Sequence, residues 1–285
     1  MVKVLLSLLL LFSFSYSEDM GSDEELVVLD NPLTSKIKSF LSEEKYNKNE
    51  AFINVIFEPN SAFFVNDRVN AVKVIQTLKE NGLLKLFYKK PQALELNFKT
   101  SGSPLFFVKI MGDTLRNIGY YRYMTLASDL DSSAFSWKIG LKSEYITDPM
   151  ILEKELKKSG CSIIDIERNT PKEWTYVIDM NSAYLNIQKV AAQKDIRLRR
   201  SQYAHWLDIS KIKELHIKSP KRNSWYPYIA YYDASLHLLK VLRKDKIVHD
   251  IFLNIPSNTQ YIKISDIYNM KNIRDDLLLI PSHSK

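Results

Sequence analysis

The feature that most constrains the fold is a pattern that recurs three times between about residues 50 and 180. Gly82, Gly119 and Gly160 each end a helical pattern and begin a strand-like one. A leucine lies four residues before each glycine, and an apolar run, a polar turn and a second, alternating run follow it. Because glycine readily adopts the left-handed conformation that commonly ends a helix, the pattern predicts three tandem helix-hairpin (αββ) units.

Local signals support each unit. Val72, Ile75 and Leu78 lie at steps of three on one face of the first helix. The third helix is predicted to begin at Asp148-Pro149, a cap followed by proline. The second strands alternate apolar and polar residues, which is typical of sheets with one packed face. Their apolar residues are Leu94, Leu96 and Phe98, then Phe135, Trp137, Ile139 and Leu141, then Trp174, Tyr176 and Ile178.

One such unit cannot bury its own apolar face, so the three are predicted to pack into one sheet covered by helices, or into a short array. A helix at about 34–45 and a strand at "FINVIF", residues 52–57, are expected before them. This outline is similar to small periplasmic modules of the BON type. The resemblance covers architecture only and implies no activity.

From about Asn181 the pattern changes to nine short apolar or alternating runs, separated by polar turns. Such spacing predicts an antiparallel β-sandwich or barrel. The step "IPSNTQYIKI" and the order of the runs resemble galactose-binding-type jelly-roll domains. That resemblance implies either sugar binding or a packing role. The predicted fold is therefore α+β, with an α+β domain at 34–180 and a β-sandwich at 181–285.

The N-terminus predicts export. Lys3 precedes an apolar core that runs from Val4 to Phe12, and small and polar residues follow up to Ser17. This is the pattern of a cleaved signal peptide, residues 1–17, and the apolar run is short for a membrane span. The alternative is an uncleaved membrane anchor. We expect a periplasmic protein with no transmembrane segment after cleavage.

The charge is divided unevenly. The whole chain has a net charge of +7, yet the predicted N-terminal segment, residues 18–33, carries acidic residues and no Lys or Arg. The remainder is correspondingly more basic. Exported basic proteins meet anionic lipid head groups, peptidoglycan or acidic glycans more readily than nucleic acid. We therefore expect no nucleic-acid partner.

Cys161 is the only cysteine, so no intramolecular disulfide can form. An exported chain without disulfides depends on core burial, and 285 residues with 45% hydrophobic content suffice for that. Cys161 follows a predicted helix end and begins an apolar strand, which favours a buried, unreactive thiol. A catalytic thiol is the alternative, and it requires a histidine nearby in space.

The sequence contains no recognised catalytic or metal-binding motif. Its five histidines are scattered over the C-terminal part, without the paired spacing of a metal site. No catalytic residue, cofactor or metal site is predicted on these grounds.

Acidic pairs such as Asp129 with Asp131, and Asp275 with Asp276, lie in or beside predicted turns. Aspartate there usually bonds to local backbone groups, so turn formation explains them better than acid/base catalysis. A structural calcium ion in the sandwich is an open alternative, with candidate ligands Asp208, Asp233 and Asp266.

The stretch "KRNSWYPYIAYYD", residues 221–233, is the most aromatic part of the chain. As a strand it places Trp225, Pro227, Ile229 and Tyr231 on one face, which we expect in the core. Proline cannot donate to a ladder, so Pro227 predicts an edge strand or a bulge.

The opposite face and the neighbouring basic residues form the candidate binding set. Tyrosine tolerates half-burial, so this face covers the sandwich or meets a partner. Trp225 is the alternative stacking residue for a sugar ring, with amide and guanidinium groups beside it. The candidate residues are Arg222, Asn223, Trp225, Tyr226, Tyr228, Tyr232, Arg197 and Arg199.

Three functions are compatible with these features. The first is a non-enzymatic periplasmic interaction or structural protein, an accessory component of an envelope machine. The second is a glycan- or peptidoglycan-binding protein that uses the C-terminal sandwich. The third is an envelope enzyme without a recognised motif. The expected partner is an envelope protein or a glycan. The basic residues cluster at 194–200, 218–222 and 243–246, and the acidic segment at 18–33 is an additional candidate partner for these clusters.

Overall fold

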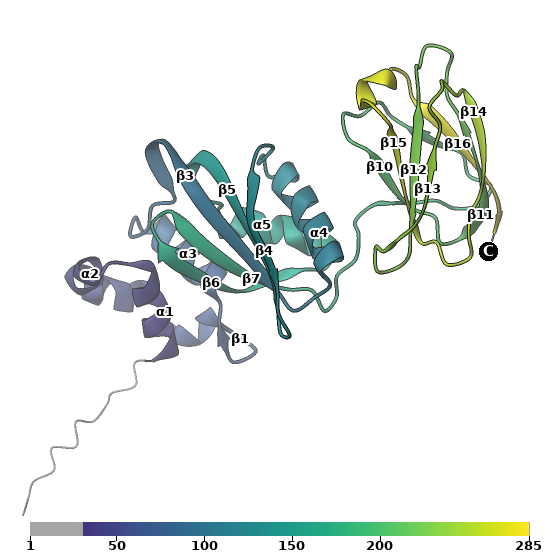
Figure 1. Cartoon of the computed structure of the whole chain (residues 1–285). Helices are drawn as coiled ribbons and strands as arrows, with labels where there is room; N and C mark the ends of the chain where they lie inside the picture. The colour runs from purple at the N-terminus through teal and green to yellow at the C-terminus, as the bar shows by residue number, and fades with distance from the viewer. Residues whose placement is uncertain (1–30, 285) are drawn as a thin grey trace, which may run out of the picture. The chain divides into compact units, whose positions relative to one another are not determined.

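The computed structural model describes residues 31–284 (Figure 1). The predicted signal peptide and nearly all of the predicted acidic segment lie outside this range. Within it the chain is mixed α+β: a first sheet with its helices lies between Pro32 and Asp179, and two further sheets lie between Gln188 and Ser284. No helix in the described range is long and apolar enough to cross a membrane.

Two helices begin the described chain, α1 (Pro32–Phe40) and α2 (Glu43–Ile56). The predicted strand at 52–57 is therefore wrong, because these residues form the end of α2. Ser42 caps this helix by accepting a hydrogen bond from the Lys45 amide. Tyr46, Ile53 and Phe57 recur at helical spacing and are buried, so the apolar residues of "FINVIF" follow the helical period and not an alternating one.

A 3-10 turn, η1 (Asn60–Phe63), and a short hairpin of β1 (Phe64–Val65) and β2 (Arg68–Val69) lead into the remaining helices. These are α3 (Ala71–Glu80), α4 (Pro104–Asn117) and α5 (Pro149–Leu156). The cap of α3 is Asn70, whose side chain accepts from the Lys73 amide.

Five strands form the first sheet in the order β4-β5-β3-β7-β6. The strands are β3 (Phe87–Thr100), β4 (Met124–Leu130), β5 (Phe135–Tyr145), β6 (Ser162–Thr170) and β7 (Glu173–Asp179). The second and third predicted units each contain a helix and an antiparallel strand pair. The first unit departs from the prediction, because α3 is followed by the single strand β3, which pairs with β7 in parallel.

The two faces of this sheet differ. The alternating apolar residues that the sequence predicted to face a core are all buried, from Leu94 to Ile178. On the opposite face the ammonium of Lys138 lies 2.9 Å from Glu173 and 3.5 Å from Glu95. The prediction of one packed and one polar face is therefore confirmed.

Residues 188–284 form two sheets, a β-rich arrangement that is compatible with a β-sandwich. One has the order β13-β12-β15-β10-β8 and the other β14-β11-β16-β9. Strands β8 and β10 pair in parallel, so the first of these sheets is mixed. Of these two C-terminal sheets, the mixed one comprises β8 (Gln188–Lys189), β10 (His205–Asp208), β12 (Pro227–Tyr232), β13 (Leu238–Arg243) and β15 (Tyr261–Asp266). The second comprises β9 (Ile196–Leu198), β11 (Ile212–Lys218), β14 (Asp250–Asn254) and β16 (Leu277–Ser284), and η3 (Met270–Asn272) precedes β16.

Strand β12 lies between β13 and β15, so the prediction of an edge strand at Pro227 is wrong. Pro227 is the first residue of β12, a position where a missing amide donor costs no ladder bond. A register shift between β12 and β13 occurs at the other end, at Tyr231 and Tyr232. The predicted faces are nevertheless right, because Trp225, Ile229 and Tyr231 are buried.

Candidate functional site

Two of the sequence-predicted binding residues are buried. The Trp225 side chain has no exposed surface, and its indole N–H donates to the Ser265 carbonyl at 2.9 Å. Asn223 is 1% exposed; its amide donates to Ser219 Oγ and to the Asp275 carbonyl, and its oxygen accepts from the backbone N–H of Arg274 and of Asp275. Neither side chain can therefore meet a ligand at the surface, which corrects their assignment as stacking and hydrogen-bonding residues.

The predicted tyrosines do share one outer face, which we call the tyrosine face. Tyr226, Tyr228 and Tyr232 are half-buried on it. The rings of Tyr226 and Tyr268 meet edge to face at 5.1 Å, and those of Tyr232 and Trp206 lie 4.9 Å apart. Burial is the largest cause of the raised pKa of Tyr232. The rings of Tyr226 and Tyr232 are therefore held in place by neighbouring aromatic rings.

The predicted arginines lie elsewhere. Arg197 is on β9 and Arg199 directly follows it, so both belong to the other sheet of this region. Arg222 is 79% exposed, and its guanidinium lies 3.6 Å from the carboxylate of Asp275. The eight predicted residues therefore separate into a buried pair, a tyrosine face on one sheet and arginines on or beside the other, and do not form one site.

The sheet that carries Arg197 presents an aromatic residue that the sequence analysis missed. Phe252 is 74% exposed, and its ring stacks on the His216 imidazole with centroids 3.8 Å apart and an interplanar angle of 15°. The imidazole Nε2 lies 2.8 Å from Asp250 Oδ1, which fixes the ring. Ile280 lies opposite His216 on the next strand. Arg197 and Lys218 lie in the adjacent row of cross-strand neighbours on the same side of this sheet. We call the outer surface that these two residues form with Phe252, His216 and Ile280 the Phe252 face.

A signal for Phe252 was present in the sequence. In "HDIFLNIP" the buried residues are Ile251, Leu253 and Ile255. Phe252 therefore lies on the same side of the strand as the polar residues Asp250 and Asn254. An aromatic residue out of phase with the apolar residues of its own strand predicts an outward-facing ring.

The second missed surface is the free edge of the first sheet. Strand β4 is the last strand in the order and, among the described strands, pairs with β5 alone. We define the β4 edge as this strand together with Tyr121. Four of its apolar side chains are between 47% and 69% exposed: Tyr121, Met124, Leu126 and Leu130.

Gly140 shapes the sheet surface beside the β4 edge. A side chain at this position would lie 3.0 Å from a methyl group of Leu126, so glycine lets Leu126 lie flat on β5. The broad depression here, of about 880 Å³, is also lined by Glu95, Arg122 and Lys142. The β4 edge therefore combines an apolar strip with a shallow recess and charged margins.

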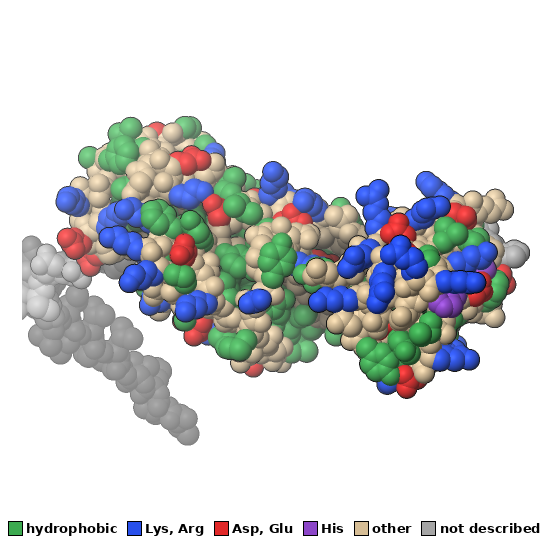
Figure 2. Space-filling model, turned by 90° about the horizontal axis from the view of Figure 1, so that it is seen from above, with side chains coloured by type: hydrophobic (Ala, Val, Ile, Leu, Met, Phe, Trp, Pro, Cys, Tyr) green, Lys and Arg blue, Asp and Glu red, His purple; other side chains and the backbone are tan. Residues whose placement is uncertain are grey.

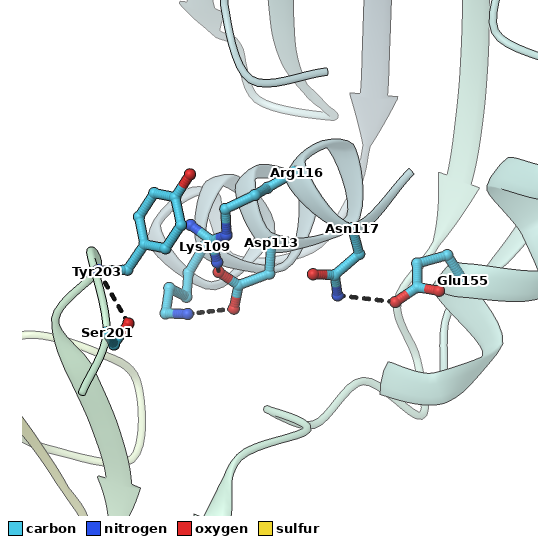
Figure 3. Close-up of polar contacts among 7 residues, drawn as sticks. All are labelled: Lys109, Asp113, Arg116, Asn117, Glu155, Ser201 and Tyr203. Carbon is cyan, nitrogen blue, oxygen red and sulfur yellow. Dashed lines mark hydrogen bonds and ion pairs between the residues drawn. The ribbon is translucent and has the colours of Figure 1, made fainter. Parts of the chain in front are cut away.

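Polar contacts fix the helices of this region (Figure 3). Asp113 on α4 pairs with both Lys109 and Arg116 of the same helix. Burial lowers the pKa of Lys109, and the Asp113 carboxylate opposes that shift. The Asn117 amide donates to Glu155 on α5 at 2.8 Å, which ties α4 to α5. These groups are satisfied by one another, as expected of a structural network.

Among the acidic pairs, Asp131 bears out the turn interpretation, whereas Asp276 accepts from the amide of Arg200, 76 residues away in the chain. Asp131 accepts hydrogen bonds from the amides of Ser133 and Ala134, and these bonds are the main cause of its lowered pKa. Of the calcium candidates, Asp266 accepts four hydrogen bonds, three of them from backbone amides. Asp208 and Asp233 likewise accept from backbone amides. Residues 31–284 contain no group of three His, Cys, Asp or Glu side chains placed to hold a metal ion.

Cys161 is buried, as the sequence predicted. Burial, with a smaller contribution from Asp179, raises the pKa of its thiol to about 11. The thiolate is the nucleophilic form, so this environment disfavours nucleophilic chemistry at neutral pH.

The surface is predominantly basic. Lys3 and six acidic residues precede Pro32, so the chain from there onward carries 39 Lys and Arg against 27 Asp and Glu, a net charge of +12. Figure 2 shows Lys and Arg side chains spread over the visible face, with hydrophobic patches between them. Such a surface favours anionic ligands and partners.

No family model, curated protein or solved structure matches this chain, so its function must be inferred from its own side chains.

Proposed function

We propose that this protein is a non-enzymatic interaction protein of the cell envelope, which binds a partner protein by strand addition at the β4 edge. The observation that carries the proposal is an unpaired edge strand of seven residues with most of its apolar side chains in solvent. The envelope location rests on the predicted signal peptide, and export is tested by fractionation of cells that express the protein.

An unpaired edge of this kind needs an explanation. Proteins usually protect edge strands with Lys, Pro, bulges or short length, because the free backbone groups recruit other strands. The β4 sequence "MTLASDL" contains no Lys and no Pro, and its only charge is Asp129. The irregular register between Thr125 and Ala127 is its one protective feature. Strand addition supplies main-chain hydrogen bonds, and alternate side chains of the added strand supply specificity.

The surroundings indicate the chemistry of the partner. Met124 and Leu126 offer an apolar strip, so the added strand should carry apolar residues at alternate positions. Two basic residues, Arg122 and Lys142, and one acidic residue, Glu95, line the recess, so its charged side chains are mainly positive. An extended partner segment with acidic residues beside its apolar ones therefore fits best.

Lysine substitution tests the proposal. Met124→Lys places a charge on the edge, and we expect at least a tenfold loss of partner recovered by affinity purification after crosslinking in cells. Val55→Lys is the matched control, since Val55 on α2 is 70% exposed and Met124 is 69% exposed. Equal loss in both variants, or no loss in either, would refute the role of the β4 edge.

A second candidate function is glycan binding by the Phe252 face. Phe252 and His216 form a flat stacked pair, and Arg197 and Lys218 supply cations for an acidic sugar. Aromatic rings and polar groups on a rigid sheet suit sugar rings, and the resemblance to galactose-binding-type jelly rolls points the same way. We infer that the finer arrangement of residues 188–284 is of that jelly-roll kind.

Calorimetric titration with soluble muropeptides tests this second candidate. Phe252→Ser should abolish the heat of binding, whereas Phe52→Ser, at an exposed phenylalanine of α2, should preserve it. Binding that survives Phe252→Ser, or no binding by the unmodified protein at millimolar muropeptide, would exclude the Phe252 face as a glycan site.

A further inference from the structure

A cavity of about 590 Å³ lies where two helices of the first region end and a third begins. Gly82 and Gly119, which follow α3 and α4 with φ of 72° and 103°, both line it. After each glycine the chain turns back toward its helix: the Leu83 amide donates to the Leu78 carbonyl, and the Tyr120 amide donates to the Leu115 carbonyl. Both glycine-ended turns therefore contribute to the wall of one cavity. We call this cavity the helix-end pocket.

The helix-end pocket is lined mainly by apolar side chains. Leu84, Leu86 and Ile146 are buried around it. Phe87 and Ile151 line it as well, and each is more than half exposed. A volume between about 300 and 1,000 Å³ with an apolar lining and a few polar groups is typical of small-molecule sites. The pocket is therefore large enough, and apolar enough, to hold a slender hydrophobic ligand.

Two lysines line this pocket, Lys79 and Lys85, and they differ in whether a carboxylate pairs with them. Lys79 pairs with Asp148 at 2.5 Å, and Asp148 also caps α5 through the Met150 amide. The Asp148 charge is therefore already matched. Lys85 is exposed and forms no ion pair within the part of the chain that the structure describes. An ammonium group without a counter-ion beside an apolar cavity complements a ligand with an anionic end and a hydrophobic body.

We propose that the helix-end pocket binds an alkyl chain that carries one anionic head group, with the chain against Leu84, Leu86 and Ile146 and the head at Lys85. A free long-chain carboxylate and an acyl chain of an anionic lipid share this chemistry. The β4 edge takes no part in this site, because none of its residues lines the pocket. Failure of one proposal thus leaves the other intact.

Calorimetric titration with octanoate, decanoate and dodecanoate tests the site on the purified protein. Each added methylene should strengthen binding about fourfold while the chain remains inside the pocket. Lys85→Ala should weaken dodecanoate binding up to about fivefold and leave dodecanol binding unchanged. Lys172→Ala, at an exposed lysine of the β6–β7 turn, is the matched control and should change neither.

Ile151→Glu supplies a second variant. Ile151 is 54% exposed, so the substitution should leave the thermal unfolding curve unchanged while it places a negative charge in the wall. We expect dodecanoate binding to fall more than tenfold. Vesicles that contain phosphatidylglycerol distinguish the sources: capture that dodecanoate displaces assigns the pocket to a lipid acyl chain, and no capture assigns it to free carboxylates.

Three results would overturn the proposal. The first is no binding of dodecanoate up to its solubility limit. The second is affinity that does not change with chain length. The third is an equal effect of Lys85→Ala and Lys172→Ala.

Discussion

Asn223→Ala tests the reassignment of Asn223 from ligand binding to folding. The substitution removes four hydrogen bonds. One was donated to the Ser219 hydroxyl, and the other three leave backbone groups without this partner: the amides of Arg274 and Asp275, and the Asp275 carbonyl. An unsatisfied buried group costs about 1–3 kcal/mol. The side chain of Asp275 is a third exposed, so water reaches this turn and the low end of that energy range applies. Three groups at about 1 kcal/mol each predict that the free energy of unfolding falls by about 3 kcal/mol.

Urea denaturation followed by tryptophan fluorescence measures this change, because Trp225 lies in the same region. A loss of 3 kcal/mol should lower the midpoint by about 1 M or more at typical slopes. Arg222→Ala is the adjacent control and should change the free energy by no more than about 0.5 kcal/mol, since Arg222 is largely exposed. Equal stability of the two variants would show that the hydrogen bonds of Asn223 do not hold this turn.

Three further predictions concern individual positions. Gly160→Ala should destabilise the protein more than Gly119→Ala in the same urea assay. A methyl group at Gly160 would lie 2.1 Å from the Ser182 carbonyl oxygen, whereas the space at Gly119 is open. Equal losses of stability in the two variants would contradict this prediction. The native Cys161 thiol should resist a maleimide at pH 7.5 until the protein unfolds, since burial raises its pKa, and rapid labelling would refute that burial. Burial lowers the pKa of His205 below 6.5, so the unfolded chain binds the proton more readily. The free energy of unfolding should therefore fall as the pH drops below about 6.5, and His205→Gln should reduce this slope; an unchanged slope would exclude His205 as the cause.

Alternation was the most reliable sequence signal. It identified the buried residues of β5 and β7, among them Trp137 and Tyr176, and it assigned the correct face to Trp225. Alternation depends on the fixed geometry of a strand, which neighbouring strands do not alter. Asp131 was equally predictable, because its carboxylate bonds within its own turn.

Elements that depend on tertiary context were harder to predict. The polar turn predicted in the first unit, between the run after Gly82 and the alternating run, is absent, because β3 continues through Pro91 with an irregular register toward β5. Proline is tolerated where the ladder is already interrupted. The residues of "FINVIF" have high strand propensity, yet the cap at Ser42 and the buried helical face of α2 override it.

The candidate surfaces were missed for a related reason. Exposure of Met124 and Leu130 follows from the position of β4 at the end of the sheet, and strand order is set by long-range packing. The helix-end pocket likewise requires Gly82 and Gly119 to line one cavity, although 36 residues separate them in the chain. The outward phase of Phe252, in contrast, could have been inferred from its strand alone.

Photo-crosslinking tests the central claim most directly. A benzophenone amino acid at Met124, Leu126 or Leu130 should form adducts with the same partner in cells, and peptide mapping should place all three adducts on one extended segment of that partner. The same group at Val55 on α2 should give no such adduct. Adducts at the three β4 positions that are no more frequent than at Val55, or that scatter over unrelated proteins, would contradict strand addition at the β4 edge.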